Sequence, residues 1–312
     1  MSRRGRVGLG LIGLGPAWEQ VYRDPLVRLQ SRLTIRLVYD PVEARSRSVA
    51  GEFEAEAAGS LRQILTRHTL QGLLVLDPGW CGAGVLNLIA RCGKPAFLSA
   101  PVLRQAWRSI VAVPTDPTAL KGPASKSNDQ LMPELGLRFT PASCRLRELM
   151  ATKLGRARRI EVDCDLASSI EDTATLIDWC TDIMGQTPTI WAPTTNSSSA
   201  VSQIEFEFPP SAASSPAVKR IARLRQQPAD KPSLRIELEC ERGRAVLSDR
   251  THITWQTAAD SADESLTDER TELEILIDQF CRRALGGLNP VARFSEFVQA
   301  MQIARSVRPD RP

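Results

Sequence analysis

Two glycines near the start of the chain have the spacing of a phosphate-binding loop. Gly13 and Gly15 follow an apolar run over residues 6–12, and residues 16–29 favour a helix. Asp40 ends the next apolar run, over residues 34–39. In a Rossmann loop the first glycine makes the turn, the second lets the backbone approach a pyrophosphate, and an acidic residue of this kind binds the ribose hydroxyls. The spacing therefore predicts that Gly13, Gly15 and Asp40 contact a dinucleotide.

Trp18 departs from that pattern. It occupies the third position of the loop, where a glycine normally lets the helix pack closely on the strand. A large indole at this position must either displace the helix or project toward the phosphate site. A glycine turn without any ligand therefore stays open as the alternative interpretation.

Apolar runs alternate with helical patterns through the first hundred residues, which is typical of a parallel sheet covered on both faces. The runs cover residues 6–12, 34–39, 72–76 and 95–98. Residues 114–128 are rich in turn formers and predict a linker. We expect an α/β fold that begins with a Rossmann-like, doubly wound dinucleotide-binding domain over residues 1–125.

The pattern changes after the linker. Residues 126–312 predict an α+β domain for substrate binding or oligomerisation, with a large, mostly antiparallel open sheet. Strand patterns cover residues 134–139, 157–166, 201–208, 234–240 and 245–248. Two amphipathic helices end the chain, and we expect the closing helix, residues 291–307, to pack back on the first domain.

Composition excludes several classes of protein. The 40 basic and 36 acidic residues give a net charge of only +4, the arginines are scattered, and aromatic residues make up 5%, so we expect no nucleic-acid partner. No apolar stretch has the roughly 20 residues of a membrane helix. Seven cysteines without C-x-x-C spacing and two histidines predict no metal site. A basic start before an apolar run is similar to a signal peptide, but its glycines favour a buried strand, and we expect a cytoplasmic protein.

Residues 93–103, GKPAFLSAPVL, resemble the G-K-H-V-L-C-E-K-P-L-A segment of the Gfo/Idh/MocA oxidoreductases, the glucose–fructose oxidoreductase and inositol dehydrogenase family. Residues 74–78 are similar to the family's V-x-I-x-T-P strand end, with Asp77 in place of threonine. Residues 138–141 are similar to its R-x-x-P segment, and residues 177–185 to the end of its H-x-x-D helix. The resemblance extends over nearly the whole chain.

The resemblance implies a nicotinamide site whose acid–base residues are missing. In the family a lysine and a histidine flank the nicotinamide, and their positions here are Ala100 and Thr175, while Ser99 replaces a glutamate. Neither alanine nor threonine exchanges a proton at neutral pH. Two carboxylates, Asp77 and Asp178, are the substitutes to consider, although each pattern favours a structural role. The implied cofactor-binding residues are Gly13, Gly15, Asp40, Asp77, Pro78 and Pro101.

These residues favour a catalytically degenerate oxidoreductase-fold protein, a pseudoenzyme with possible residual nicotinamide-nucleotide binding. The alternative is an active NAD(P)-dependent oxidoreductase that acts on a sugar or cyclitol with a rearranged acid–base residue. Some relatives with this fold cleave glycosides. That reaction also needs proton transfer, so the missing lysine and histidine count against it as well. Asp40 favours NAD, whereas Arg45 and Arg47 leave NADP open. The resemblance also implies a homo-oligomer through the sheet of the second domain.

Overall fold

The computed structural model describes residues 6–77, 83–111, 130–165, 169–195, 201–210, 219–226, 234–267, 269–287 and 291–307. The chain divides into two compact units. The first contains Met1–Leu135 and Leu273–Ser295, and the second contains Gly136–Glu272 and Glu296–Pro312. The expected domain boundary after residue 125 lies outside the described residues and stays a prediction.

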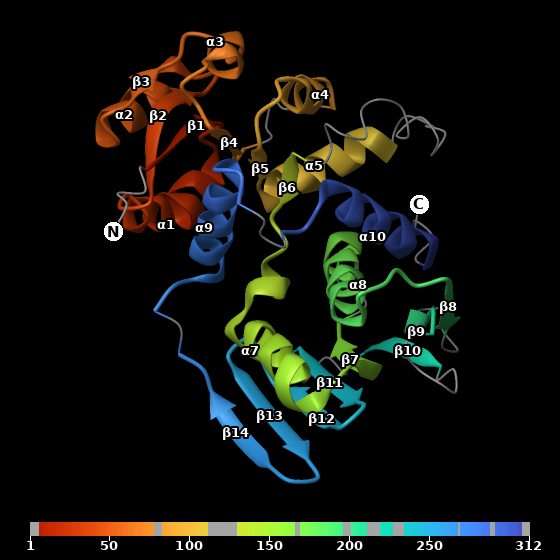
Figure 1. The fold of residues 1–312 in the computed structure, drawn as a ribbon. Helices are drawn as coiled ribbons and strands as arrows, with labels where there is room; N and C mark the ends of the chain where they lie inside the picture. The colour runs from red at the N-terminus through yellow and green to blue at the C-terminus, as the bar shows by residue number, and fades with distance from the viewer. Residues whose placement is uncertain are drawn as a thin grey trace. The chain divides into compact units, whose positions relative to one another are not determined.

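The first unit is built on a six-stranded sheet in the order β3-β2-β1-β4-β5-β6 (Figure 1). Every neighbouring pair is parallel, which confirms the predicted doubly wound Rossmann-type sheet. The chain order reverses between β1 and β4, and open α/β sheets bind ligands at the carboxyl ends of strands at such a point. The strands are β1 (Val7–Ile12), β2 (Leu33–Tyr39), β3 (Glu56–Ala57), β4 (Gly72–Val75), β5 (Ala96–Leu98) and β6 (Leu131–Pro133).

Helices connect these strands and cover the sheet. They are α1 (Arg23–Arg28), preceded by the π-helix η1 (Trp18–Tyr22), then α2 (Glu43–Glu52), α3 (Leu61–Thr66), α4 (Ala83–Arg91) and α5 (Ala100–Val111). Local sequence sets where a helix begins. Helix α3, for example, begins after Ser60, whose hydroxyl accepts a hydrogen bond from the Gln63 amide.

One helix of the first unit comes from the far end of the chain. Apart from its first residue, α9 (Glu272–Ala284) belongs to this unit, and Figure 1 shows it beside α1. Phe280 is fully buried with its ring centroid 6.0 Å from that of Phe97. A Cβ at Gly72 would lie 2.9 Å from the Phe280 ring, so a residue larger than glycine would push the helix away. Glu274 is buried on the same helix and pairs with Arg28 at 3.1 Å.

The second unit is built on an eight-stranded sheet in the order β14-β13-β12-β11-β7-β10-β9-β8. Only the pair β7–β10 is parallel, which confirms the predicted large and mostly antiparallel sheet. The strands are β7 (Ala157–Cys164), β8 (Ile190–Thr195), β9 (Val201–Phe208), β10 (Arg220–Gln226), β11 (Arg235–Cys240), β12 (Gly243–Leu247), β13 (His252–Thr257) and β14 (Ser261–Ser265).

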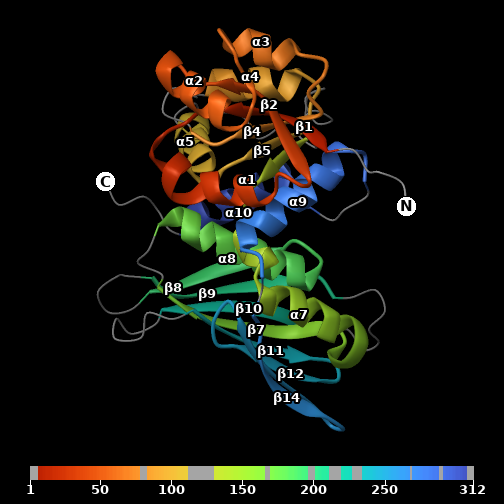
Figure 2. The same ribbon diagram turned by 90° about the vertical axis from the view of Figure 1, so that its left-hand side faces the viewer.

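The two faces of this sheet differ because its strands alternate apolar and charged residues. On β7, Ile160 and Val162 are fully buried, while Glu161 and Asp163 lie on the other face. Helices α7 (Pro141–Leu149) and α8 (Ile170–Met184) lie together on one side of the sheet (Figure 2). The opposite face carries ion pairs.

One prediction about the second domain meets a different geometry, and another stays untested. Residues 134–139, predicted as a strand, instead follow the short strand β6 and form the 3₁₀-helix η3 (Gly136–Phe139). The closing helix is α10 (Phe294–Val307), and from Glu296 onward it belongs to the second unit. Its expected packing on the first domain stays a prediction. No helix in the described part of the chain is long and apolar enough to cross a membrane.

Candidate functional site

The glycine loop of the first unit is fixed by its own backbone and by Asp40. Gly13 has a φ of +83°, which glycine adopts without a steric penalty, and its amide donates to the Tyr39 carbonyl at 2.9 Å. The two carboxylate oxygens of Asp40 accept hydrogen bonds from the amides of Leu14 and Val42, each at 2.8 Å. Asp40 is buried, and these bonds engage both oxygens that the predicted ribose contact would use.

Because Gly15 has no side chain, it leaves an opening beside the loop, and the side chain of Asp77 fills this opening. A Cβ added to Gly15 would lie 1.4 Å from Oδ2 of Asp77, so the carboxylate occupies the space that a side chain at position 15 would need. In a Rossmann loop the second glycine keeps this space open for the pyrophosphate. Asp77 follows β4 and Gly15 follows β1, so the carboxylate lies at the point where the strand order reverses.

Trp18 points into the core of the first unit. The indole is 3% exposed, and its ring meets the edge of the Phe53 ring at a centroid distance of 5.9 Å. Its N–H finds no acceptor among the described residues. The residues that follow the loop form the π-helix η1, which is wider than an α-helix. The indole therefore lies in the core of the first unit, at the start of this π-helix.

A carboxyl group lies beside Ala100, the position where the resemblance places a lysine. Oε2 of Glu134 accepts hydrogen bonds from the Ala100 amide and from the Tyr22 hydroxyl, both at 2.8 Å. Ser99 is fully buried, and its hydroxyl donates to the Leu76 carbonyl at 2.8 Å. Glu134 was not among the predicted site residues, because it begins a segment whose pattern predicts a strand. An acid directly after an apolar run was the signal available.

Burial shifts the titration of this pair. It raises the pKa of Glu134 above its ordinary value of 4.5, while the hydrogen bonds from Ala100 and Tyr22 favour the ionised carboxylate and oppose the shift. Burial, followed by the charge of Glu134, also raises the pKa of Tyr22. Tyr22 therefore stays a neutral phenol at physiological pH, and its hydroxyl donates a hydrogen bond to Glu134.

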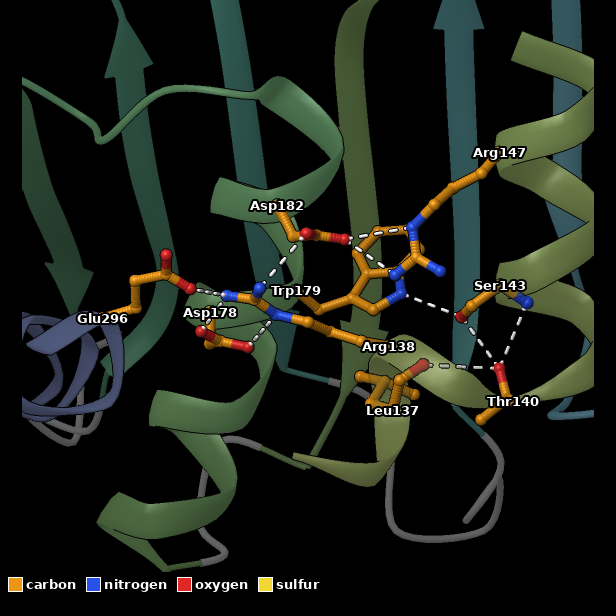
Figure 3. Close-up of polar contacts among 9 residues, drawn as sticks. All are labelled: Leu137, Arg138, Thr140, Ser143, Arg147, Asp178, Trp179, Asp182 and Glu296. Carbon is orange, nitrogen blue, oxygen red and sulfur yellow. Dashed lines mark hydrogen bonds and ion pairs between the residues drawn. The ribbon is translucent and has the colours of Figure 1, made fainter. Parts of the chain in front are cut away.

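The second unit holds Asp178 in a buried ion pair (Figure 3). Nε and Nη2 of Arg138 donate to its two oxygens at 2.7 and 2.5 Å, and Asp178 is 2% exposed. Arg138 also reaches Asp182 at 3.2 Å and Glu296 at 2.9 Å. Burial works against the charge of Arg138, but the carboxylates around it raise its pKa overall. Both oxygens of Asp178 are thus bound by Arg138, which is the arrangement of a structural ion pair.

Neighbouring contacts in Figure 3 hold this ion pair in place. Arg147 pairs with Asp182 at 2.7 Å. The indole N–H of Trp179 donates to the Ser143 hydroxyl at 2.9 Å, and Thr140 caps α7 by accepting from the Ser143 amide. A pocket of about 260 Å³ lies over the cluster and is lined by Arg138, Asp178, Thr181, Asp182, Gly185, Gln186, Thr187, Glu296, Gln299, Ala300 and Ile303.

The remaining predicted site residues supply no titratable side chain. Thr175 is half-buried on α8, and its hydroxyl donates to the Glu171 carbonyl at 2.9 Å within the helix. Pro101 lies in the first turn of α5, where a missing amide costs no helical hydrogen bond. Pro78 lies outside the described residues. No group of three histidine, cysteine or carboxylate side chains among the residues described could hold a metal ion.

No family model matches the sequence, and no curated protein matches it. Solved structures do resemble it along nearly its whole length. UDP-N-acetylglucosamine 3-dehydrogenase from Acidithiobacillus ferrooxidans has a TM-score of 0.69 at 17% identity, covering 97% of both chains. A Gfo/Idh/MocA family oxidoreductase from Vibrio cholerae has a TM-score of 0.66 at 12% identity, covering 96% of both. Levoglucosan dehydrogenase, in complex with NADH and levoglucosan, has a TM-score of 0.64 at 11% identity, covering 97% of this chain and 96% of its own.

The structural neighbours of this chain are thus Gfo/Idh/MocA oxidoreductases, and the chain has their fold. At these sequence identities the likeness establishes the fold, as the resemblance implied.

Proposed function

We propose that this chain, with its Gfo/Idh/MocA fold, does not carry out lysine- and histidine-dependent dehydrogenation and acts as a binding or assembly subunit. The observation that carries the proposal is the Asp77 carboxylate in the opening at Gly15. A loop that is filled by an internal anion is poorly suited to an anionic dinucleotide.

Electrostatic repulsion between like charges acts in the same direction. Two like charges 4 Å apart repel by about 4 kcal/mol at an effective dielectric constant of about 20. That energy corresponds to about a thousandfold in affinity. The carboxylate of Asp77 must leave Gly15 before a pyrophosphate approaches. Residual binding of NAD or NADP is therefore weak in this proposal.

The two proton-transfer positions support the same proposal. Ala100 presents only a methyl group and a backbone amide that is bound to Glu134. Thr175 uses its hydroxyl inside its own helix. Removing one general acid or base typically costs about 10²–10⁴-fold in rate. Asp178, the acid that the resemblance retains at the end of the H-x-x-D motif, is paired with Arg138.

The first experiment is a titration of the purified protein with NADH and NADPH, followed by energy transfer from tryptophan. We expect no saturation below millimolar nucleotide. Asp77→Thr installs the residue that the resemblance places at this position, and we expect it to bind at least about tenfold more tightly. Asp24→Thr removes an exposed carboxylate of the same unit and should leave the titration unchanged.

Micromolar binding by the unmodified protein would contradict the proposal, especially with reduction or oxidation of a sugar. That result would support the second candidate, an active NAD(P)-dependent oxidoreductase acting on a sugar or cyclitol. One observation favours this candidate: the Glu134 carboxyl lies beside Ala100.

A further inference from the structure

We propose that Glu134 is an acid–base group of the first unit, which binds a small ligand through a hydrogen-bond donor and exchanges a proton with it. Tyr22 acts as its positioning residue. This inference goes beyond the proposed function, because it requires neither a lysine at position 100 nor a bound dinucleotide.

Glu134 lies where parallel sheets place their functional groups. It follows β6 directly, at the carboxyl edge of the sheet. Its carboxyl connects two further elements of the same edge, since it accepts from Ala100 at the start of α5 and from Tyr22 in the helix after the glycine loop. The resemblance places a glutamate at Ser99, so a neighbouring strand supplies a carboxyl close to that position.

Only one of its two oxygens is used internally. Both hydrogen bonds end on Oε2, and within the described ranges no hydrogen bond reaches Oε1. Glu134 is half-buried. An anchored Oε2 fixes the carboxyl plane, and Oε1 is left to meet a ligand.

The surroundings favour the protonated form of Glu134 more than water does. Burial raises the pKa of Glu134, and the groups that oppose this shift are the Ala100 amide, the Tyr22 hydroxyl and the charge of Arg104 on α5. General acids and bases work best when their pKa lies near the working pH. An exposed glutamate with an ordinary pKa would be almost fully ionised at neutral pH and a poor proton donor.

One labelling experiment tests both whether the Glu134 carboxyl is accessible to a reagent and whether it is protonated. A water-soluble carbodiimide with glycine ethyl ester modifies carboxyl groups that are both protonated and accessible, and mass spectrometry locates the product. We expect Glu134 to react, and its rate relative to the exposed Glu19 to rise as the pH increases from 4.5 to 6.5. Buried Glu274, which pairs with Arg28, should stay unmodified.

A purely structural carboxyl would give the opposite result. If Glu134 reacts as slowly as Glu274, or if its rate falls with pH in step with Glu19, the proposal is overturned. Neither outcome depends on nucleotide binding, so failure here is distinct from failure of the Asp77 experiment.

Tyr22→Phe separates positioning from packing. It keeps the buried ring but removes a hydrogen bond to the ionised carboxylate, so we expect the midpoint of the Glu134 titration to rise by about one pH unit. The midpoint is read from the ¹³Cδ signal of labelled glutamate, assigned with Glu134→Gln. An unchanged midpoint in folded Tyr22→Phe protein would remove Tyr22 from the proposal, and a wild-type midpoint at or below 4.5 would remove Glu134.

Discussion

At the scale of single residues, three carboxylates lie at the carboxyl ends of strands in the first unit, and the sequence indicated two of them. Asp40 and Asp77 were placed at strand ends because apolar runs stop there. Their partners were not predictable, since a spacing rule says nothing about which amides a carboxylate accepts from. Asp40 binds Leu14 and Val42, and Asp77 lies against Gly15. Glu134 was missed because its partner Tyr22 is 112 residues away in the sequence.

Glu134 also predicts a pH dependence of stability. Its pKa is raised in the folded state, so between the unfolded value of 4.5 and the folded value the native protein binds more protons. The free energy of unfolding therefore falls as the pH rises through this range, by about 1.4 kcal/mol for each pH unit that separates the folded and unfolded pKa. Glu134→Gln should remove this fall.

Both tyrosines, Tyr22 and Tyr39, belong to the first unit, so ¹⁹F signals of 3-fluorotyrosine report its unfolding in urea. The expected result is a difference between Glu134→Gln and wild type that grows in favour of the variant from pH 4.5 upward. A difference that is the same at every pH would show that Glu134 titrates equally in the folded and unfolded chain.

At the scale of elements, continuous apolar runs predicted the first sheet and alternating patterns predicted the second, but neither predicted every boundary. Apolar residues alternate at Leu135, Leu137 and Phe139 as in a strand, yet residues 136–139 form a 3₁₀-helix in which Arg138 is buried too. Short apolar runs do not distinguish these two structures. The sequence also did not predict that α9 belongs to the first unit. Its amphipathic pattern indicates that one face of the helix is buried, but it does not indicate which sheet covers that face.

The Arg138 cluster ties η3 to α8 and α10 within the second unit. Arg138→Met leaves the buried Asp178 without its counter-ion, and we expect a loss of about 3–5 kcal/mol in the free energy of unfolding. The exposed pair of Arg235 and Glu237 is the matched control, and Arg235→Met should cost under about 1 kcal/mol. Urea denaturation of each variant measures both values.

The pH dependence of the stability loss in Arg138→Met provides a second test of the same cluster. In Arg138→Met protein Asp178 loses the group that favours its ionised form, whereas burial continues to raise its pKa. Its protonation then removes the buried charge, so the deficit should shrink as the pH falls. Equal losses for Arg138→Met and Arg235→Met would show that the cluster contributes no more than a surface pair.

At the scale of the whole molecule, the open face of the second sheet is a surface of balanced charge. Arg223 pairs with Glu205 at 2.6 Å, and Arg225 pairs with Asp163 at 2.8 Å. Such half-exposed pairs contribute little to stability, about 0–1 kcal/mol each. Balanced charge is compatible with a second copy of the same face, since acidic and basic groups can meet across a two-fold axis.

We therefore propose a homo-oligomer through this face, as the resemblance implied. A hollow of about 530 Å³ lies on it, and Val246 is a half-buried residue of its lining. Val246→Arg adds a bulky charge without breaking any existing ion pair, so it should separate the subunits while circular dichroism stays unchanged. Sedimentation velocity is expected to show a dimer or larger species for wild type and a monomer for Val246→Arg. Arg67→Glu, on the first unit, should leave the oligomer intact. A wild-type monomer at tens of micromolar would show instead that the charged face is adapted to solvent, because paired side chains already satisfy one another there.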